Sequence, residues 1–198
     1  MPTTPLDLLD LIANDSPWKK KIISIPASAF PNKQTVEKLT IAAAPYDTEE
    51  LAQAAFGKSN PNRYGVLPVL VVMQNDGKGA LRLNDMEVRY VTPDGSRLES
   101  TPAQDLQYLS GGKRPRQPGG PTSPIPIPRG RSKNPMSGWE IDGRAFAVKM
   151  LPAGQAANGF FYFQTVPREG AQLYITGIQE AATGKELFYV EIPLKGAR

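Results

Sequence analysis

Three acidic side chains, Asp94, Glu99 and Asp105, lie near one another in the sequence and are the residues that could support hydrolysis. Two carboxylates can act as general acid and general base when they face each other across a substrate. These acids occupy positions typical of turns and helix starts, so we interpret them as surface residues. A carboxylate-dependent hydrolase is kept as the enzymatic alternative.

Other catalytic chemistries lack the residue types that they need. The sequence contains no histidine and no cysteine. A Ser-His triad, a cysteine nucleophile, a disulfide and a thiolate metal site are therefore impossible. We predict a protein that is not an enzyme and that has no catalytic residue, no metal site and no cofactor.

Two short motifs resemble parts of ligand-binding loops but lack essential residues. The segment Phe56-Gly57-Lys58-Ser59 ends like a phosphate-binding loop, but Ala52 stands where the first glycine is required. The segment Asn75-Asp76-Gly77 lacks the spaced carboxylates and the final glutamate of a calcium loop. We predict a hairpin turn there, with left-handed backbone.

The best candidate for binding is the stretch from residue 111 to residue 135, which is rich in Pro and Gly and has six basic residues but no acidic one. Its centre, Ser123-Pro124-Ile125-Pro126-Ile127-Pro128, favours an extended polyproline conformation that can lie in a groove of a partner protein. Its arginines could instead bind a polyanion or an anionic surface. Nucleic acid is not expected, because no interleaved aromatic residues or nucleic-acid motif accompany them. A solvated connecting loop is the third interpretation.

The N-terminal segment is the second candidate. Residues 4–13 are predicted to form a helix of about two turns, which is marginal unless its apolar side packs on its own domain, the first interpretation, or on a partner, the second. Exposing that side together with Trp18 would leave an apolar patch of the kind that marks an interface. The predicted partner-binding residues of both segments are Leu8, Leu9, Ile12, Trp18, Arg114, Arg116, Ile125, Ile127, Arg129 and Arg131.

The body between these segments is predicted to be rich in strands. The chain has 20 Pro and 18 Gly in 198 residues, which shortens helices and multiplies turns. The nearly continuous apolar run from Gly65 to Gln74 predicts a strand that is buried on both faces. One helix is expected over residues 47–58, capped by Asp47 and ended by Gly57. The other predicted strands are 36–43, one starting at 81–83, 86–91, a strand or strand pair within 139–151, 159–166, and a hairpin of 173–180 with 186–194. In its last strand Phe188, Val190 and Ile192 are expected to point one way and Leu187, Tyr189 and Glu191 the other, as suits a sheet with one face in the core.

Three of these stretches resemble a known group of domains. They are the run Gly65-Val66-Leu67-Pro68-Val69-Leu70-Val71-Val72-Met73-Gln74-Asn75, the strand from Leu81 to Tyr90, and the terminal hairpin around Thr183-Gly184-Lys185. Together they resemble immunoglobulin-like sandwich domains of uncharacterised bacterial cell-envelope proteins and lipoproteins, over about half of the chain. The resemblance implies an envelope, periplasmic or extracellular location and no catalytic residues. The chain shows no clear signal-peptide or membrane-span pattern, which is expected of a cytoplasmic protein, so the location stays open.

We therefore predict an all-β, immunoglobulin-like antiparallel sandwich over residues 36–198. It carries one or two short helices and the loop insertion 111–135, and a short helix with a linker precedes it over residues 1–35. The predicted function is a noncatalytic structural or protein-interaction module. It would be a subunit or accessory of a bacterial surface or envelope assembly, or would form a homo-oligomer.

Overall fold

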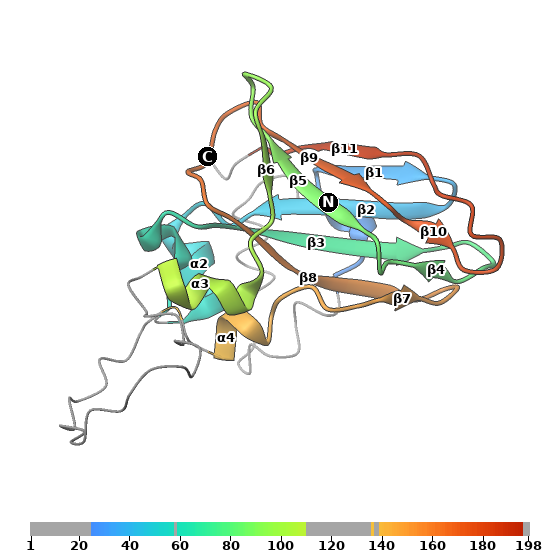
Figure 1. Cartoon of the computed structure of the whole chain (residues 1–198), viewed down its shortest axis with the longest axis horizontal. Coiled ribbons are helices and arrows are strands. Elements are labelled where there is room, and N and C mark those ends of the chain that lie inside the picture. Colours follow the sequence, from blue (N-terminus) through green and yellow to red (C-terminus); the bar gives the residue numbers. More distant parts are fainter. Residues whose placement is uncertain (1–24, 58, 110–135, 137–138, 196–198) are drawn as a thin grey trace, which may run out of the picture.

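The computed structural model describes residues 25–57, 59–109, 136 and 139–195. Its largest sheet has the antiparallel order β1-β2-β3-β8 (Figure 1). The strands of this sheet are β1 (Lys33–Val36), β2 (Leu39–Pro45), β3 (Leu67–Asn75) and β8 (Ala156–Phe163). We call it the helix-covered sheet, because short helices pack on its outer face.

A second four-stranded antiparallel sheet, the open sheet, has the order β11-β9-β5-β6. Its strands are β11 (Val190–Pro193), β9 (Gln172–Thr176), β5 (Glu87–Val91) and β6 (Arg97–Glu99). A short sheet of order β10-β4-β7 joins β10 (Gln179–Glu180), β4 (Leu81–Arg82) and β7 (Met150–Leu151). The prediction of an all-β antiparallel sandwich is confirmed.

The sandwich core lies between the helix-covered sheet and the open sheet. Alternate residues of β2 and β3, such as Ile41 and Val71, point into it, and Val88 and Ile175 meet them from the open sheet. All four are almost fully buried. Burying one such side chain contributes about 1.5–3 kcal/mol, so this alternating set holds the two sheets together.

A second apolar cluster, the helix-side cluster, covers the other face of the helix-covered sheet. The helices are α2 (Glu49–Phe56), α3 (Ala103–Leu109) and α4 (Trp139–Asp142), with the 3-10 helices η2 (Ala27–Ala29) and η3 (Pro61–Tyr64). Phe56 of α2, Leu106 of α3 and Ile141 of α4 pack on Phe160 and Tyr162 of β8. Consequently β3 is buried on both faces, as its continuous apolar run predicted.

The packed body begins before residue 36. Ile25, Ala27 and Phe30 belong to the helix-side cluster, and β1 already starts at Lys33. Residues 25–35, predicted as linker, therefore contribute to the fold. The strand expected over 36–43 is a hairpin of β1 and β2 instead, turning at Glu37 and Lys38 with φ of 45° and 67°.

Helix α2 is confirmed, but its cap is one residue later than expected. The hydroxyl oxygen of Thr48 accepts a hydrogen bond from the backbone N–H of Leu51 at 3.2 Å, so Thr48 caps the helix in place of Asp47. Gly57 ends it with φ of 60°, a conformation that glycine adopts without steric penalty.

The predicted hairpin at Asn75-Asp76-Gly77 is wrong. The next strand, β4, does not pair with β3 but with β10 and β7 of the short sheet, and none of the three residues has a positive φ. The Asn75 side chain instead accepts from the N–H of Gly77 and donates to the carbonyls of Gly79 and Leu151. These hydrogen bonds fix the segment that connects β3 of the helix-covered sheet to β4 of the short sheet.

The segment 139–151, expected to be a strand or strand pair, is mostly something else. It begins with α4 and reaches a strand only at β7. The single helical turn of α4 is enough to bury the Ile141 side chain in the helix-side cluster, and this burial favours a helix at this place. The turn at Pro93-Asp94-Gly95 is confirmed, since it joins β5 to β6 with Gly95 at φ of 86°.

The C-terminal hairpin is also confirmed, but its predicted alternation is wrong at two residues. Val190 pairs with Ile175, and the amide of Leu187 donates to the carbonyl of Ile178 at 2.7 Å. Leu187 is buried like Val190 and Ile192, and Phe188 is exposed like Tyr189 and Glu191, so each lies on the side opposite to the one that the alternation predicts. The opposing strand is distorted at Gly177, with φ of 76°, and this break shifts the in-out alternation before Val190.

No helix within the described ranges is long and apolar enough to cross a membrane.

Candidate functional site

The partner-binding residues predicted from the sequence lie outside the described residues. They are Leu8, Leu9, Ile12, Trp18, Arg114, Arg116, Ile125, Ile127, Arg129 and Arg131. Their predicted role stays a prediction, and the described part of the chain offers two other candidate sites.

The acids considered for hydrolysis each have a local structural setting. The carboxylate of Asp94 caps the β5–β6 turn, accepting from the hydroxyl of Thr92 and from the amide of Ser96, and these hydrogen bonds hold the pKa of Asp94 below its usual value. Glu99 lies on β6 beside Arg89, and Asp105 lies in the first turn of α3. Among the described residues no hydrogen bond or ion pair joins these three acids, and no group of acidic side chains is placed to hold a metal ion.

The two faces of the sandwich differ in what covers them. Figure 1 shows the short helices gathered against one end of the helix-covered sheet. The outward residues of the open sheet, by contrast, are exposed or half-buried along β5, β9, β11 and β6. We call this surface the open face.

An aromatic stack stands on the open face. Tyr174 of β9 and Tyr189, just before β11, stack with ring centroids 5.4 Å apart and an interplanar angle of 28°. On the other side of β9, the guanidinium carbon of Arg97 on β6 lies 5.3 Å from the centroid of the Tyr174 ring. Tyr174 is therefore contacted from both sides, whereas Tyr189 is at one end of the stack and 55% exposed. Phe188 beside it is 73% exposed.

The charges of the open face are partly paired. Arg89 is 2.6 Å from Glu87 and 4.0 Å from Glu99. Glu191 is the cross-strand partner of Tyr174 and shares its outward face. No ion pair within the described residues includes Glu191. An exposed ring and a free carboxylate are thus neighbours, an arrangement that suits a cationic side chain.

Sequence reasoning found part of this face. The alternation of the last strand correctly placed Tyr189 and Glu191 on one face, which is the outward one. It missed Phe188, because the shift opposite Gly177 cannot be seen in the sequence of a single strand. It also missed the contact between Tyr174 and Arg97. These residues lie on β9 and β6, which are far apart in the sequence and are brought to the two sides of β5 only in the folded sheet. One signal in the sequence could have indicated this face. The adjacent aromatic residues Phe188 and Tyr189 precede a strand whose core positions are already filled by Val190 and Ile192.

A cavity of about 640 Å³, the end pocket, opens at one end of the sandwich. Its buried wall contains Leu67 of β3, Tyr90 of β5, Ala171 and Leu194. Three prolines also line it, Pro45, Pro167 and Pro193. Since Pro45 and Pro193 end β2 and β11 and lack an N–H, backbone pairing stops here.

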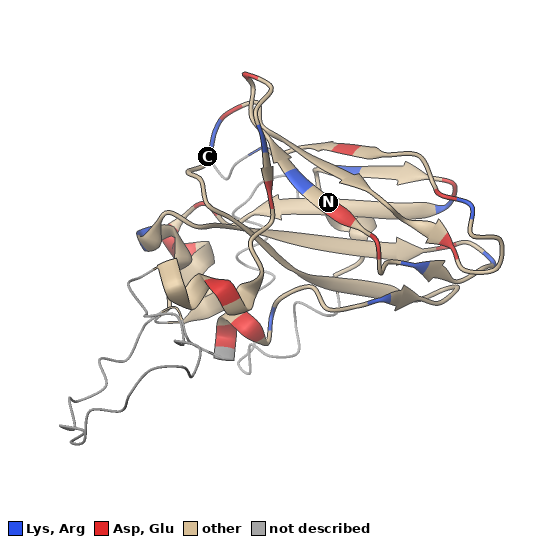
Figure 2. Ribbon diagram, in the orientation of Figure 1, with Lys and Arg blue, Asp and Glu red and all other residues tan. Residues whose placement is uncertain are grey.

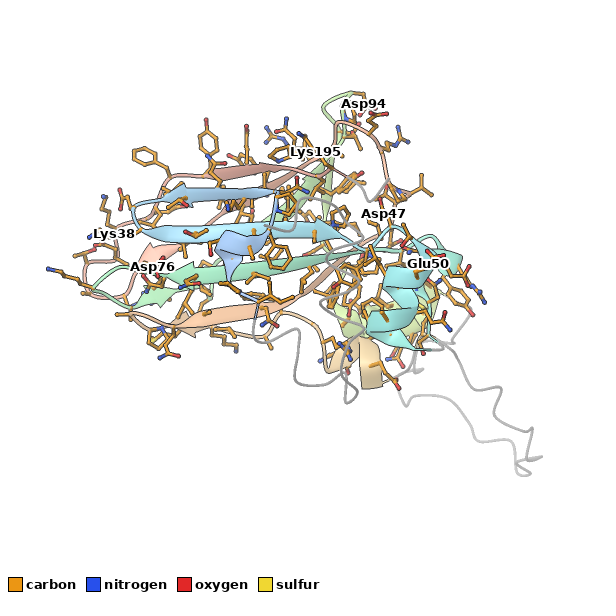
Figure 3. All side chains as sticks on the ribbon, turned by 180° about the vertical axis from the view of Figure 1, so that it is seen from behind. Lys38, Asp47, Glu50, Asp76, Asp94 and Lys195 are labelled. Atoms are coloured by element: carbon orange, nitrogen blue, oxygen red, sulfur yellow. The ribbon has the colours of Figure 1, made fainter. Side chains whose placement is uncertain are left out.

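Four charged residues stand at the end pocket: Asp47, Arg168, Glu169 and Lys195. Figure 3 shows Asp47 and Lys195 at the same end of the molecule, opposite Lys38 and Asp76. The hydroxyl oxygen of Tyr90 accepts a hydrogen bond from the amide of Arg168 at 3.0 Å. Burial raises the pKa of Tyr90, and the neighbouring Arg168 opposes that effect.

A buried polar group lies under the helices as well. The hydroxyl of Tyr162 donates to the carbonyl of Ile141 at 2.7 Å. The hydroxyl of Tyr46 is buried and has no hydrogen-bond partner among the described residues. Burial raises the pKa of both tyrosines, and the nearby Arg144 opposes that effect. Since Tyr162 links β8 to α4 through its hydrogen bond to the Ile141 carbonyl, we interpret the group as structural.

Acidic side chains mark the helical end of the molecule, as Figure 2 shows in red on the three short helices. Glu49 and Glu50 begin α2, and Glu140 and Asp142 lie on α4. Arg63, paired with Glu49, is a basic residue of the same end. The open face has both signs of charge, so the two surfaces differ in their electrostatic character.

Comparisons with known proteins give structural similarity only. No known family model and no curated protein sequence matches the chain. The crystal structure of the yjhA protein from Bacillus subtilis matches with a TM-score of 0.44 and 8% identity, covering 84% of this chain and 98% of that one. A functionally unknown protein from Listeria monocytogenes matches with a TM-score of 0.38 and 13% identity, covering 84% of this chain and 81% of that one.

Proposed function

We propose that this chain is a noncatalytic protein-interaction module that binds a partner protein through the open face. The observation that carries the proposal is the exposed end of the aromatic stack, Tyr189, with Phe188 beside it. Tyrosine, phenylalanine and arginine are enriched at the centres of protein interfaces, and these residue types meet here. The role as a subunit of a bacterial surface or envelope assembly is the finer form of this proposal.

The chemistry of the open face favours a partner that presents a basic side chain. The outer ring face of Tyr189 can take a guanidinium or ammonium group by a cation–π contact, as Tyr174 already does with Arg97. Glu191 can supply the carboxylate for the same group. Glu191 is on β11, and Tyr189 directly precedes that strand and is stacked on Tyr174, so little conformational entropy is lost when the partner docks.

A comparison of single variants tests this function. The full chain is immobilised and exposed to lysate of its native source, and the bound proteins are quantified for the wild type, Tyr189→Ala and Glu191→Gln. Met150→Ala is the matched control, because Met150 is 53% exposed but lies on β7, outside the open face.

The proposal expects a protein that the wild type and Met150→Ala retain and that both open-face variants lose. Increased salt should weaken its retention, since an exposed cation–carboxylate contact is screened. Retention of the same proteins by all four chains, with circular dichroism showing that all are folded, would count against the open face. So would a wild type that retains nothing above an empty resin.

A further inference from the structure

The end pocket goes beyond the proposed function, because it is lined by none of the residues of the open-face stack. Its volume of about 640 Å³ is within the range of about 300–1,000 Å³ that is usual for small-molecule sites. The buried part of its wall is apolar, with Leu67, Ala171 and Leu194. Such a wall accepts an apolar ligand body and excludes water from it.

The pocket is shaped by rigid backbone. Pro45, Pro167 and Pro193 each have a fixed φ. Two hydrogen bonds hold the loop before β9. The amide of Arg168 donates to the Tyr90 hydroxyl oxygen, and the amide of Ala171 donates to the carbonyl of Arg168 at 3.2 Å. A ligand would therefore meet a preformed cavity and would not have to order it.

The polar groups at the mouth favour an anion. Arg168 and Lys195 have exposed side chains, and no ion pair within the described residues includes either of them. The lining also contains two acids, Asp47 and Glu169, and Asp47 lies near enough to Tyr90 to raise its pKa. Arg168 and Lys195 are the lining charges whose ion-pair capacity is unused among the described residues, so they are the ones that an anionic ligand can engage.

Tyr90 adds a third donor. Its oxygen already accepts the hydrogen bond from Arg168, and no described residue accepts the hydroxyl proton. A phenol that stays protonated and faces a cavity can donate that proton to an anionic oxygen, as donors in preformed anion sites do. This donor comes from the buried wall, whereas the two cations come from the rim.

We propose that the end pocket binds a small amphiphilic carboxylate. Its apolar body fills the cavity against Leu67, Ala171 and Leu194, and its carboxylate is held by the Tyr90 hydroxyl with Arg168 and Lys195. The ligand class is defined by this chemistry: one carboxylate attached to an aromatic or branched aliphatic body of drug-like size or smaller.

The test uses the full chain and two matched probes, 4-phenylbutyrate and its uncharged amide. Binding is followed by changes in the amide NMR signals of Leu67, Tyr90, Ala171 and Leu194. The proposal expects saturable shifts with the carboxylate and binding of the amide about tenfold weaker or worse, which corresponds to the loss of one charged contact.

Charge variants separate this site from nonspecific binding. Arg168→Gln and Lys195→Gln should each weaken binding of the carboxylate by about fivefold to tenfold, and Tyr90→Phe by a similar factor. Lys185→Gln is the control, because Lys185 is a surface cation that pairs with Glu37 in the β1–β2 turn and does not line the pocket. It should bind as the wild type does.

Three results would each overturn the proposal. One is equal affinity for the carboxylate and the amide. Another is unchanged affinity in both Arg168→Gln and Lys195→Gln. The third is the lack of saturable shifts in the four reporter amides up to about 10 mM probe, since the Kd would then lie above about 10 mM, too weak for an apolar cavity with three donors to the carboxylate. None of these results bears on the partner-binding test of the open face.

Discussion

Any side chain at Gly177 would collide with the carbonyl oxygen of Asp85, because a Cβ at that position would overlap it. Gly177 also has φ of 76°, in the left-handed region that disfavours other residues. This close approach of two backbones lies where β9 passes from the open sheet towards β10 of the short sheet. It fixes the point at which the C-terminal hairpin changes its alternation.

We expect Gly177→Ala to lower the free energy of unfolding by about 3 kcal/mol or more, from the left-handed strain and the backbone collision together. Gly184→Ala is the control, because Gly184 has φ of 71° but open space around its Cα. That variant should lose only about 1 kcal/mol. Urea denaturation measures both, and equal losses would show that the collision with Asp85 is relieved without strain.

The neighbours Leu187 and Phe188 should respond in opposite ways to a polar substitution. Leu187 is 5% exposed within the sandwich core and Phe188 is 73% exposed. Leu187→Ser should lower the free energy of unfolding by about 3 kcal/mol, and Phe188→Ser should change it by less than about 0.5 kcal/mol. Thermal unfolding of the two variants checks this. The reverse order would mean that the alternation runs unbroken through residue 188.

The two buried phenols beneath the helices should also differ. Tyr162→Phe removes the donor to the Ile141 carbonyl and should lower the free energy of unfolding by about 2 kcal/mol. Tyr46→Phe removes a buried hydroxyl with no described partner and should raise it by about 1 kcal/mol. A loss in Tyr46→Phe as large as in Tyr162→Phe would show that the Tyr46 hydroxyl has a partner, such as a buried water.

The same tyrosines set an alkaline limit on stability. Burial raises the pKa of Tyr46 and Tyr162 above the usual value of 10.0. Above that pH the unfolded chain releases phenolic protons that the folded chain retains, so folding stability is full below pH 10 and falls as the pH rises. Unfolding by urea at pH 9, 10 and 11 should show this fall. The double variant Tyr46→Phe/Tyr162→Phe should show less of it.

The β1–β2 turn can be improved. Lys38 has φ of 67°, which costs about 1 kcal/mol for a residue other than glycine. Removing this strain is partly offset by the freedom that glycine adds to the unfolded chain, so Lys38→Gly should stabilise the fold by about 0.5 kcal/mol and raise the Tm by about 1–2 °C. Lys78→Gly, at an exposed position without a positive φ, should give no gain, because glycine there only adds freedom to the unfolded chain.

The capped turn between β5 and β6 gives a prediction at acid pH. Hydrogen bonds from Thr92 and Ser96 lower the pKa of Asp94, so they stabilise the folded state above the usual carboxyl pKa, and this contribution is lost as pH falls through the lowered value. Thr92→Val should move the pKa of Asp94 upward, towards 3.8. Carbon-13 NMR titration of the carboxyl group measures it, and an unchanged pKa would exclude Thr92 as the cause.

The parts of this fold that were predictable are those encoded in one continuous stretch. Burial of β3 on both faces is visible as a run of apolar residues without alternation, and the end of α2 is visible as Gly57. Asn75 marks the opposite case. The residues around Asn75 predict a hairpin turn. The side-chain amide of Asn75 instead donates to the carbonyls of Leu151 and Pro152. Partners so distant in the sequence determine which sheet the next strand joins.

The candidate sites were harder to predict for the same reason. The end pocket combines residues from Pro45 to Lys195, and no two of its charged side chains share a strand. The open-face stack takes one residue each from β6, β9 and the stretch before β11. Strand order, which loop closure and core packing determine together, brings these residues into contact.

The central position of β3 also affects how the chain is made. β3 pairs on one side with β2, which precedes it closely, but its other partner, β8, is translated only after β4, β5, β6, α3 and α4. Until the ribosome has delivered Phe163, one edge of the most apolar strand is unpaired, and exposed edges of this kind can recruit other chains. Solubility during synthesis should therefore depend on how fast β8 emerges, and slow codons between β3 and β8 should increase aggregation of the nascent protein.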